Sequence, residues 1–422
     1  MRIFLTKSSN VERESFIWNM AGSLLAAFQS VVFLMILTRT VGLVASGVFT
    51  IAYANANLFL NIGKYGMRNF QVSDVKKEFS FQDYLKSRWI TTAIMLIVSV
   101  IYVLYTGSVN QYSSEKSWII IWMCLFKLPD AFEDVYYGDY QKKGRLDVAS
   151  RALTVRMLAT IVFFAIAVIF TRNLLTTLIL STIFTTLLMV LFLRWTRTEF
   201  LENEKANGNS IKQLLWVCFP VFLSAFLSFY IGNAPKYAID AQLNDELQAC
   251  YGFIAMPVFV IGLLNGFIFN PILFRLSCLW NDGKVQEFLK NIAKQILIVF
   301  SITGICLIGA YLLGIPVLSL LYNTDLSPYK AELLILLLGG GFLGLSGVLC
   351  AVITIIRYQN ALVVGYSIVA LMALVLSNEV VRKYEMMGAA VLYAVLMALL
   401  CVCFFFILYV GVKRREKDDR NC

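Results

Sequence analysis

The sequence predicts an all-α integral membrane protein of about twelve transmembrane helices, arranged as two parallel-repeat six-helix bundles around a central cavity. Three observations support this prediction. The chain of 422 residues is 59% hydrophobic and 15% charged, with a mean hydropathy of +0.74, which is far more apolar than a soluble domain. Its apolar residues fall into windows of about 20, the length that crosses the hydrocarbon core as a helix. Lys and Arg are frequent in every second connection between these windows and scarce in the others.

The apolar windows predict spans near residues 15–38, 42–63, 88–106, 117–138, 152–170, 173–193, 211–232, 248–273, 291–313, 331–355, 360–378 and 387–411. The second span is rich in Ser and Asn, so we expect it to line an internal cavity and not to face lipid on all sides. The stretch from Phe79 to Leu85 is expected to form a short amphipathic helix at the membrane surface. The glycines Gly339, Gly340 and Gly341 predict a close helix contact in the tenth span.

The distribution of basic residues predicts the orientation of the chain. If the N-terminus is inside, the inner segments hold 28 of the 36 Lys and Arg residues and the outer segments hold seven. Short cytoplasmic loops are the basic ones in multi-pass proteins. We therefore expect a protein of the cell membrane with both termini in the cytoplasm. The formal charge of +10 then reflects orientation and attraction to anionic lipid, and no nucleic-acid partner is expected.

The chain is expected to divide near its middle. The segment RWTRTEFLENEKANGNSIK, which starts at Arg194, has no apolar run and mixes charges of both signs. We interpret residues 1–197 as one six-helix bundle, 198–210 as a cytoplasmic linker, and 211–422 as a second bundle with a charged tail. Two halves of the same orientation would be parallel repeats, with the solute path between them.

The fourth span carries the densest charge within an apolar run. Lys127, Asp130, Glu133 and Asp134 follow one another at helical spacings. A single charge at the bilayer centre costs about 2.5 to 3.5 kcal/mol on insertion scales, so the four require mutual pairing, water or an interfacial position. Two interpretations are open: a structural Lys–Asp network, or a site for a coupling ion. Pro129 is predicted to bend this helix beside the charges.

The polar segment that follows this span resembles a known family. From Asp134 to Ser150 the chain reads D-x-Y-Y-G-x-x-Q-x-x-x-R-L-x-x-x-S, which is similar to a pattern of the Wzx-type oligosaccharide flippases of bacterial polysaccharide synthesis. These belong to the multidrug/oligosaccharidyl-lipid/polysaccharide exporter superfamily. The resemblance extends to T-R-x-V-G-x-x-x-x-G-x-F at Thr38–Phe49, to P-K-Y-A-I at Pro235–Ile239, and to the hydropathy of nearly the whole chain.

The resemblance implies a flippase for an undecaprenyl-diphosphate-linked oligosaccharide, with membrane lipids as surroundings and a glycan polymerase and chain-length proteins as candidate partners. Cationic side chains would offset the cost of carrying a diphosphate through the bilayer. The candidate substrate-binding residues are Arg39 and Lys236, which lie in family-like motifs, with Arg68, Arg151 and Arg275 on the inner side. Many such flippases also carry an arginine well inside the first or second span, and this chain does not. No resident cofactor or metal is expected, and coupling to Na⁺ or H⁺ is left open.

Other functions are weighed against this one. The chain contains no histidine, which excludes His-metal sites and Ser-His triads, and no P-loop is present, so we do not expect an enzyme. A cation-coupled multidrug exporter of the same superfamily would need buried acids in spans one, two, seven or eight, which lack them away from their ends. A membrane glycan polymerase would need a longer outer loop. A scaffold without transport activity stays open.

Overall fold

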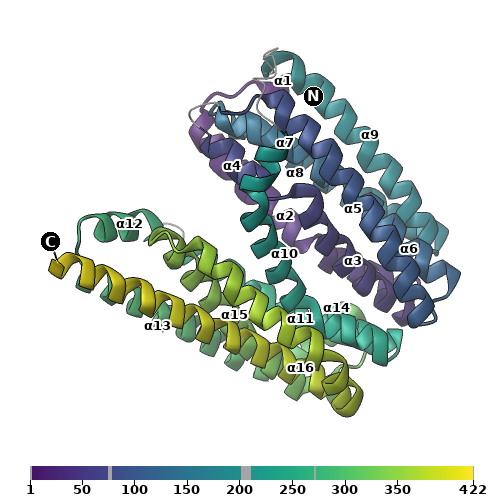
Figure 1. Cartoon of the computed structure of the whole chain (residues 1–422). Coiled ribbons are helices and arrows are strands. Elements are labelled where there is room, and N and C mark those ends of the chain that lie inside the picture. The colour runs from purple at the N-terminus through teal and green to yellow at the C-terminus, as the bar shows by residue number, and fades with distance from the viewer. Residues whose placement is uncertain (1, 75–77, 201–210, 270–271, 422) are drawn as a thin grey trace. The chain divides into compact units, whose positions relative to one another are not determined.

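The computed structural model describes residues 2–74, 78–200, 211–269 and 272–421, and in these ranges it is helical and contains no strand (Figure 1). The chain forms two compact units, Met1–Phe226 and Leu227–Cys422, and the division falls inside helix α10. Most of the expected linker, residues 201–210, lies outside the described residues. Each unit is described by itself below.

The first unit contains nine helices and the start of a tenth within the described residues. They are α1 (Arg2–Thr6), α2 (Val11–Thr40), α3 (Leu43–Lys64), α4 (Met67–Ser73), α5 (Phe81–Val109), α6 (Ser114–Phe126), α7 (Leu128–Lys142), α8 (Leu146–Thr171), α9 (Leu174–Phe200) and the beginning of α10 (Ile211–Gln242).

The second unit continues α10 and adds six further α-helical segments. They are α11 (Asp245–Phe269), α12 (Leu273–Asn281), α13 (Val285–Gly309), α14 (Ile315–Tyr322), α15 (Lys330–Ile355) and α16 (Gln359–Asn421). A π-helical turn, Ala310–Gly314, joins α13 to α14.

The predicted spans all correspond to helices of the structure. Ten helical stretches of the described chain are long and apolar enough to cross a membrane. The fourth predicted span is divided between α6, of 13 residues, and α7, of 15 residues. Each of these helices alone is too short to be among the ten. The last two spans are both in α16, where Glu385 has non-helical backbone angles (φ 48°, ψ −130°) and separates them. The all-α membrane architecture is therefore confirmed.

Helix α3 is the core of the first unit. It packs against α2, α5, α6 and α7, and 15 of its 22 residues are buried. Gly63 makes the approach of two of these neighbours possible, because a Cβ there would lie 2.8 Å from the Met95 sulfur and 3.1 Å from the Ala131 Cβ. The prediction that the second span faces the interior is confirmed.

Helix α15 has the same central role in the second unit, where it packs against α11, α13 and α16. Its glycines are the contact points. A Cβ on Gly339 would lie 2.6 Å from the Tyr393 ring, and one on Gly341 would lie 2.6 Å from the side chain of Thr303. The predicted close helix contact is confirmed, since small residues let helix backbones approach one another.

The expected surface helix at Phe79–Leu85 is wrong. Ser80 caps the N-terminus of α5 and forms a capping box with Asp83, so these residues are the beginning of a membrane span. Phe81 and Tyr84 are buried in a cluster with residues of α4, α7 and α10. Their apolar side chains pack against protein, and a lipid-facing amphipathic helix would have left them exposed.

Candidate functional site

The first charged residue of the site, Lys127, lies at a break between two helices. Helix α6 ends at Phe126 and α7 begins at Leu128, with Pro129 in its first turn. Proline has no N–H to donate and its ring crowds the carbonyl four residues earlier, so a continuous helix is interrupted. The interruption lies next to the residue at which the sequence predicts a bend. Lys127 lies at the break and only 3% of it is exposed, so its ammonium group is held inside the bundle.

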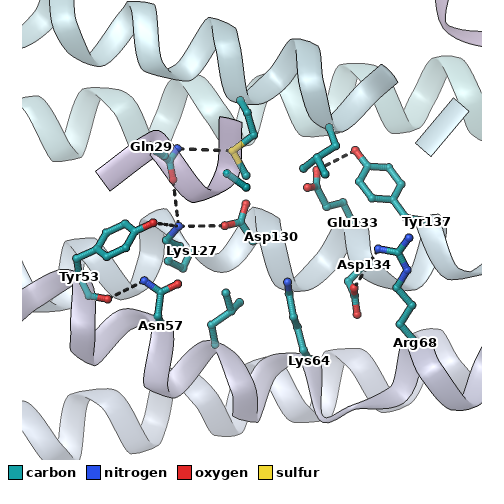
Figure 2. Close-up of a pocket in the computed structure, with 14 residues that line it drawn as sticks. Gln29, Tyr53, Asn57, Lys64, Arg68, Lys127, Asp130, Glu133, Asp134 and Tyr137 are labelled. Atoms are coloured by element: carbon teal, nitrogen blue, oxygen red, sulfur yellow. Dashed lines mark hydrogen bonds and ion pairs between the residues drawn. The ribbon is translucent and has the colours of Figure 1, made fainter. Parts of the chain in front are cut away.

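Three side chains from three helices surround the Lys127 ammonium (Figure 2). It donates to Gln29 Oε1 of α2 at 3.2 Å, to the Tyr53 hydroxyl of α3 at 3.3 Å, and to Asp130 Oδ2 of α7 at 3.4 Å. All three distances exceed the roughly 2.7 to 2.9 Å of a strong charge-assisted hydrogen bond. The ammonium is therefore satisfied but loosely held.

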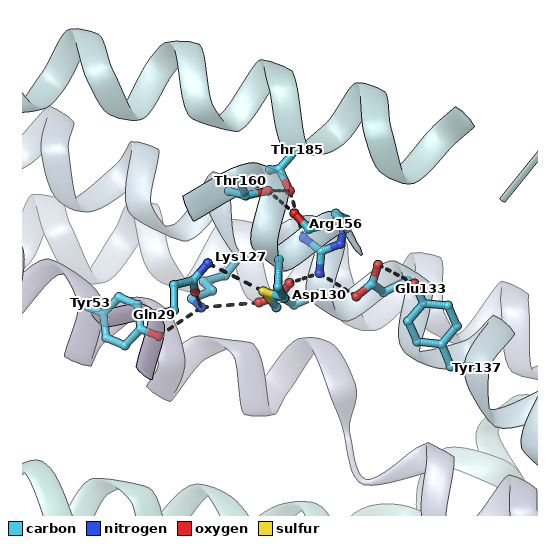
Figure 3. A network of polar contacts seen from close by, with 10 residues as sticks. Gln29, Tyr53, Lys127, Asp130, Glu133, Tyr137, Arg156, Thr160 and Thr185 are labelled. Atoms are coloured by element: carbon cyan, nitrogen blue, oxygen red, sulfur yellow. Dashed lines mark hydrogen bonds and ion pairs between the residues drawn. The ribbon is translucent and has the colours of Figure 1, made fainter. Parts of the chain in front are cut away.

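Arg156 of α8 is held far more tightly (Figure 3). It is 2% exposed and donates to Asp130 Oδ1 and Glu133 Oε1, both at 2.5 Å, and to Thr185 Oγ1 of α9 at 2.8 Å. The second oxygen of Glu133 accepts from the Tyr137 hydroxyl at 3.0 Å. The four carboxylate oxygens of Asp130 and Glu133 are thus all occupied by donors of this chain.

Asp134 belongs to a second cluster one turn further along α7. Its Oδ2 accepts from Arg88 of α5 at 2.9 Å, and Arg88 is fully buried and also donates to the Gly63 carbonyl. Arg68 of α4 lies 3.8 Å from the other oxygen of Asp134 and donates through Nε and Nη2 to Gln141 Oε1, at 3.2 and 2.9 Å.

Two residues of the flippase-like motif at Asp134–Ser150 have a structural role in this protein. Gly138 faces α4, and a Cβ at this position would collide with Gln71 Oε1 and lie 3.3 Å from Arg68 Cγ. Gln141, one turn later, is the acceptor that fixes the Arg68 guanidinium. The glycine and the glutamine of the motif therefore fasten α4 to α7.

The two clusters share one cavity of about 200 Å³. Its charged lining residues are Lys64, Arg68, Lys127, Asp130, Glu133 and Asp134. The formal charges of the three basic and three acidic lining residues cancel. Arg88 and Arg156 bind these acids without lining the cavity themselves, so the ionised site carries two positive charges in excess.

The structure places the predicted substrate-binding residues at different sites. Arg68 lines the cavity, and Arg39 is exposed at the end of α2. Lys236 is half-buried inside α10 and makes no ion pair with any residue that the structure describes, while Arg275 is exposed on α12. Arg151 is 4% exposed and is occupied by the N-terminal segment: it donates to the Phe4 and Lys7 carbonyls at 2.5 and 2.7 Å and pairs with Glu14.

Sequence reasoning missed the two buried arginines. Neither Arg88 nor Arg156 is among the predicted site residues, although Arg88 is the first residue of a predicted span and Arg156 lies inside one. A signal was available for Arg156, because it stands four residues into the predicted span 152–170, where an ionisable side chain requires a partner. Lys64 is likewise absent from the predicted site residues, although it is the last residue of α3 and lines the cavity.

Comparison with solved structures identifies the class of fold. No protein-family model matches the chain. The lipid II flippase MurJ in an inward closed conformation is similar with a TM-score of 0.67, covering 94% of this chain and 87% of MurJ at 14% identity. An inward-facing multidrug resistance MATE family transporter of the MOP superfamily has a TM-score of 0.65, covering 92% of this chain and 96% of the transporter at 14% identity. The chain is thus a multi-pass membrane protein with the fold of these transporters.

The chain is also similar in sequence to one curated protein. The chain is 24% identical over 341 residues to the capsular polysaccharide biosynthesis protein CapF of Staphylococcus aureus, which covers 78% of this chain and 82% of CapF. The similarity in fold to MurJ and to a MOP-superfamily transporter, and the similarity in sequence to CapF, agree with the resemblance that the motifs indicated.

Proposed function

We propose that this protein is a flippase that moves an undecaprenyl-diphosphate-linked oligosaccharide from the inner to the outer leaflet for the synthesis of a cell-surface polysaccharide. The observation that carries the proposal is the excess of positive charge around a cavity inside a membrane bundle. Burying unneutralised charge among membrane helices is costly, and an anionic headgroup is the ligand that such a site favours. The similarity to CapF supports the link to polysaccharide synthesis.

A cation-coupled multidrug exporter is the second candidate, and the site favours it less. A cationic drug needs a carboxylate that is free to pair with it. Both oxygens of Asp130 and both of Glu133 already accept hydrogen bonds from Lys127, Arg156 and Tyr137. A cation that bound there would have to compete with these donors for the two carboxylates.

The proposed substrate path includes Arg39 and Lys236, with Arg68, Arg151 and Arg275 as further contacts on the inner side. Arg68 is the member of this group that lines the described cavity. Arg151 could reach a substrate only if the N-terminal segment moved away from it. Replacing Arg39 and Lys236 together by methionine is expected to abolish glycan display at an unchanged protein level, and normal display would remove both from the path.

The leaflet in which the lipid-linked oligosaccharide accumulates tests the proposal directly. In a deletion strain, an impermeant glycan-modifying enzyme is added to sealed vesicles of known orientation. We expect accumulation in the inner leaflet and its reversal by the gene. Accumulation of unpolymerised units in the outer leaflet would assign the protein to polymerisation. No accumulation, together with altered tolerance to cationic drugs, would assign it to multidrug export.

A further inference from the structure

We propose that a groove on the lipid-facing surface of the second unit binds an anionic phospholipid, with one acyl chain in the groove and the phosphate on Lys330. The groove lies on α13, the π-helical turn and α15 and has a volume of about 310 Å³. Its lining residues are Leu307, Ile308, Tyr311, Leu312 and Leu334. The site is separate from the charged cavity of the first unit and does not depend on the proposed function.

A π-helical turn, Ala310–Gly314, shapes the groove. Its hydrogen bonds span one residue more than those of an α-helix, and such turns often occur at functional sites. At its end Gly314 packs against α15, since a Cβ there would lie 2.9 Å from Leu333 Cδ2. Just before the turn, Gly309 has open space, with nothing within 4 Å of an added Cβ. The turn is therefore held against α15 at its end and leaves room at its start.

The groove is apolar and exposed to the bilayer. Ile308 and Leu312 are both 64% exposed, and Tyr311 is 58% exposed. All three belong to the stretch Val285–Tyr322, which is long and apolar enough to cross a membrane. None of the described lining residues is charged, and the hydroxyl of Tyr311 is the one polar side-chain group among them. A hydrocarbon chain is therefore the part of a ligand that fits the groove.

Lys330 supplies a positive charge beside the groove. Its ammonium nitrogen lies 3.8 Å from the centre of the Tyr311 ring. Lys330 is the first residue of α15 and immediately precedes the predicted tenth span, which places it at the level of the lipid headgroups. It forms no ion pair with any residue that the structure describes. Glu332 is buried, and residues two apart on a helix do not face each other. Because a contact with an aromatic ring leaves N–H donors of the ammonium unused, the group can also bind a phosphate oxygen.

Charge and size select the class of lipid. A volume of about 310 Å³ equals roughly ten water molecules at about 30 Å³ each, which is room for part of one acyl chain. The described residues around the groove offer one ammonium, which matches the single charge of a phosphodiester better than the charge of a diphosphate. No acid is among the described lining residues to bind the amine of a zwitterionic headgroup. A phospholipid with a net negative charge is therefore the occupant.

The test is lipid binding by the purified full-length protein in detergent, measured by native mass spectrometry as the affinity for the first bound lipid. Phosphatidylglycerol is titrated into the wild type and into Lys330→Met, Lys330→Arg and Ile308→Trp. Lys330→Met removes the charge and keeps the aliphatic stem, and Ile308→Trp fills the groove. Neither side chain is buried, so the second unit is expected to stay folded.

Two control variants match these changes outside the groove. Lys383→Met removes another lysine whose ammonium lies over a tyrosine ring, 5.2 Å from the centre of Tyr384. Lys383 is close to Glu379 and Arg382 and to no apolar groove that the structure describes. Leu374→Trp enlarges another exposed apolar side chain, on α16.

We expect Lys330→Met and Ile308→Trp each to weaken phosphatidylglycerol binding by about three- to fivefold, which is the effect of losing an exposed ion pair. Lys330→Arg and both control variants should bind like the wild type, and the wild type should bind phosphatidylcholine more weakly than phosphatidylglycerol. If Lys330→Met binds phosphatidylglycerol as tightly as Lys383→Met does, or if Ile308→Trp binds it as tightly as Leu374→Trp does, the site is refuted. Equal affinity for the two lipids would refute the selection by charge.

Competition with a polyprenyl phosphate tests the assignment to a phospholipid. We expect phosphatidylglycerol to stay bound to the wild type when an equal amount of the polyprenyl phosphate is added. Displacement of phosphatidylglycerol, with polyprenyl phosphate binding that is weakened by Lys330→Met, would assign the groove to an isoprenoid carrier and overturn the assignment to a phospholipid.

Discussion

Replacing Arg156 by methionine tests whether this arginine is what allows two acids to be buried next to each other. The substitution preserves an unbranched apolar stem and removes a guanidinium that contacts Asp130, Glu133 and Thr185. Removing one partner of a buried ion pair costs about 3 to 5 kcal/mol, because the remaining charge is left uncompensated. Lys127 would still neutralise Asp130, so the uncompensated group is Glu133.

The assay is the free energy of unfolding of the solubilised protein, measured by denaturant titration. We expect Arg156→Met to lose about 3 to 5 kcal/mol. The double variant Arg156→Met with Glu133→Gln should recover a large part of this loss, because the amide carries no charge and its oxygen can still accept from Tyr137. Arg194→Met, an exposed position on α9, should stay within about 0.5 kcal/mol of the wild type. Equal losses for Arg156→Met and Arg194→Met, or no recovery in the double variant, would refute the reasoning.

Three other predictions concern packing, pH and topology. Gly138→Val should destabilise the protein by about 1 to 3 kcal/mol, because the larger side chain forces α4 away from α7. Gly304→Ala, at a helical position with open space around it, should be neutral or stabilising. Equal effects of the two substitutions in a denaturant titration would contradict the close contact at Gly138. Burial raises the pKa of Asp74, but two backbone N–H groups, Lys142 and a tyrosine hydroxyl outweigh burial and hold the pKa below its ordinary value of 3.8. The stabilisation from the ionised Asp74 is present above about pH 4 and is lost as the pH falls through the folded-state pKa. Below about pH 4 the melting temperature should therefore fall more steeply for the wild type than for Asp74→Asn. Parallel pH profiles of the two proteins would argue against a lowered pKa of Asp74. A cysteine placed at Lys116 should react with an impermeant thiol reagent from outside intact cells and one at Lys142 should not, and the reverse pattern would invert the topology.

Span order was predictable from this sequence, and side-chain pairing was not. A run of about 20 apolar residues has to be a membrane helix whatever its neighbours are, which is why each predicted span corresponds to a helix. The partners of the acids were not predictable, since Arg156 is 23 residues from Glu133 and Arg88 is 46 residues from Asp134. Only the packing of α5 and α8 against α7 brings these groups together.

The stretch from Phe79 to Leu85 shows a different limit. Its pattern of apolar and polar residues fits a helix on the membrane surface as well as it fits the first turns of a buried helix. The deciding contacts come from Met67, Val135 and Leu214, which are distant in the sequence. Periodicity indicates which face is apolar, but it does not indicate whether lipid or protein covers that face.

The division of the acids and their arginines between successive helices has a consequence for biogenesis. The segment formed by α6 and α7 emerges from the ribosome with Lys127, Asp130, Glu133 and Asp134, before Arg156 of α8 has been synthesised. Until α8 is synthesised, Glu133 lacks the guanidinium group with which it pairs in the folded protein, so α7 is poorly suited to a stable position in lipid. Stable membrane integration of this span is therefore expected to depend on the synthesis of the next helix.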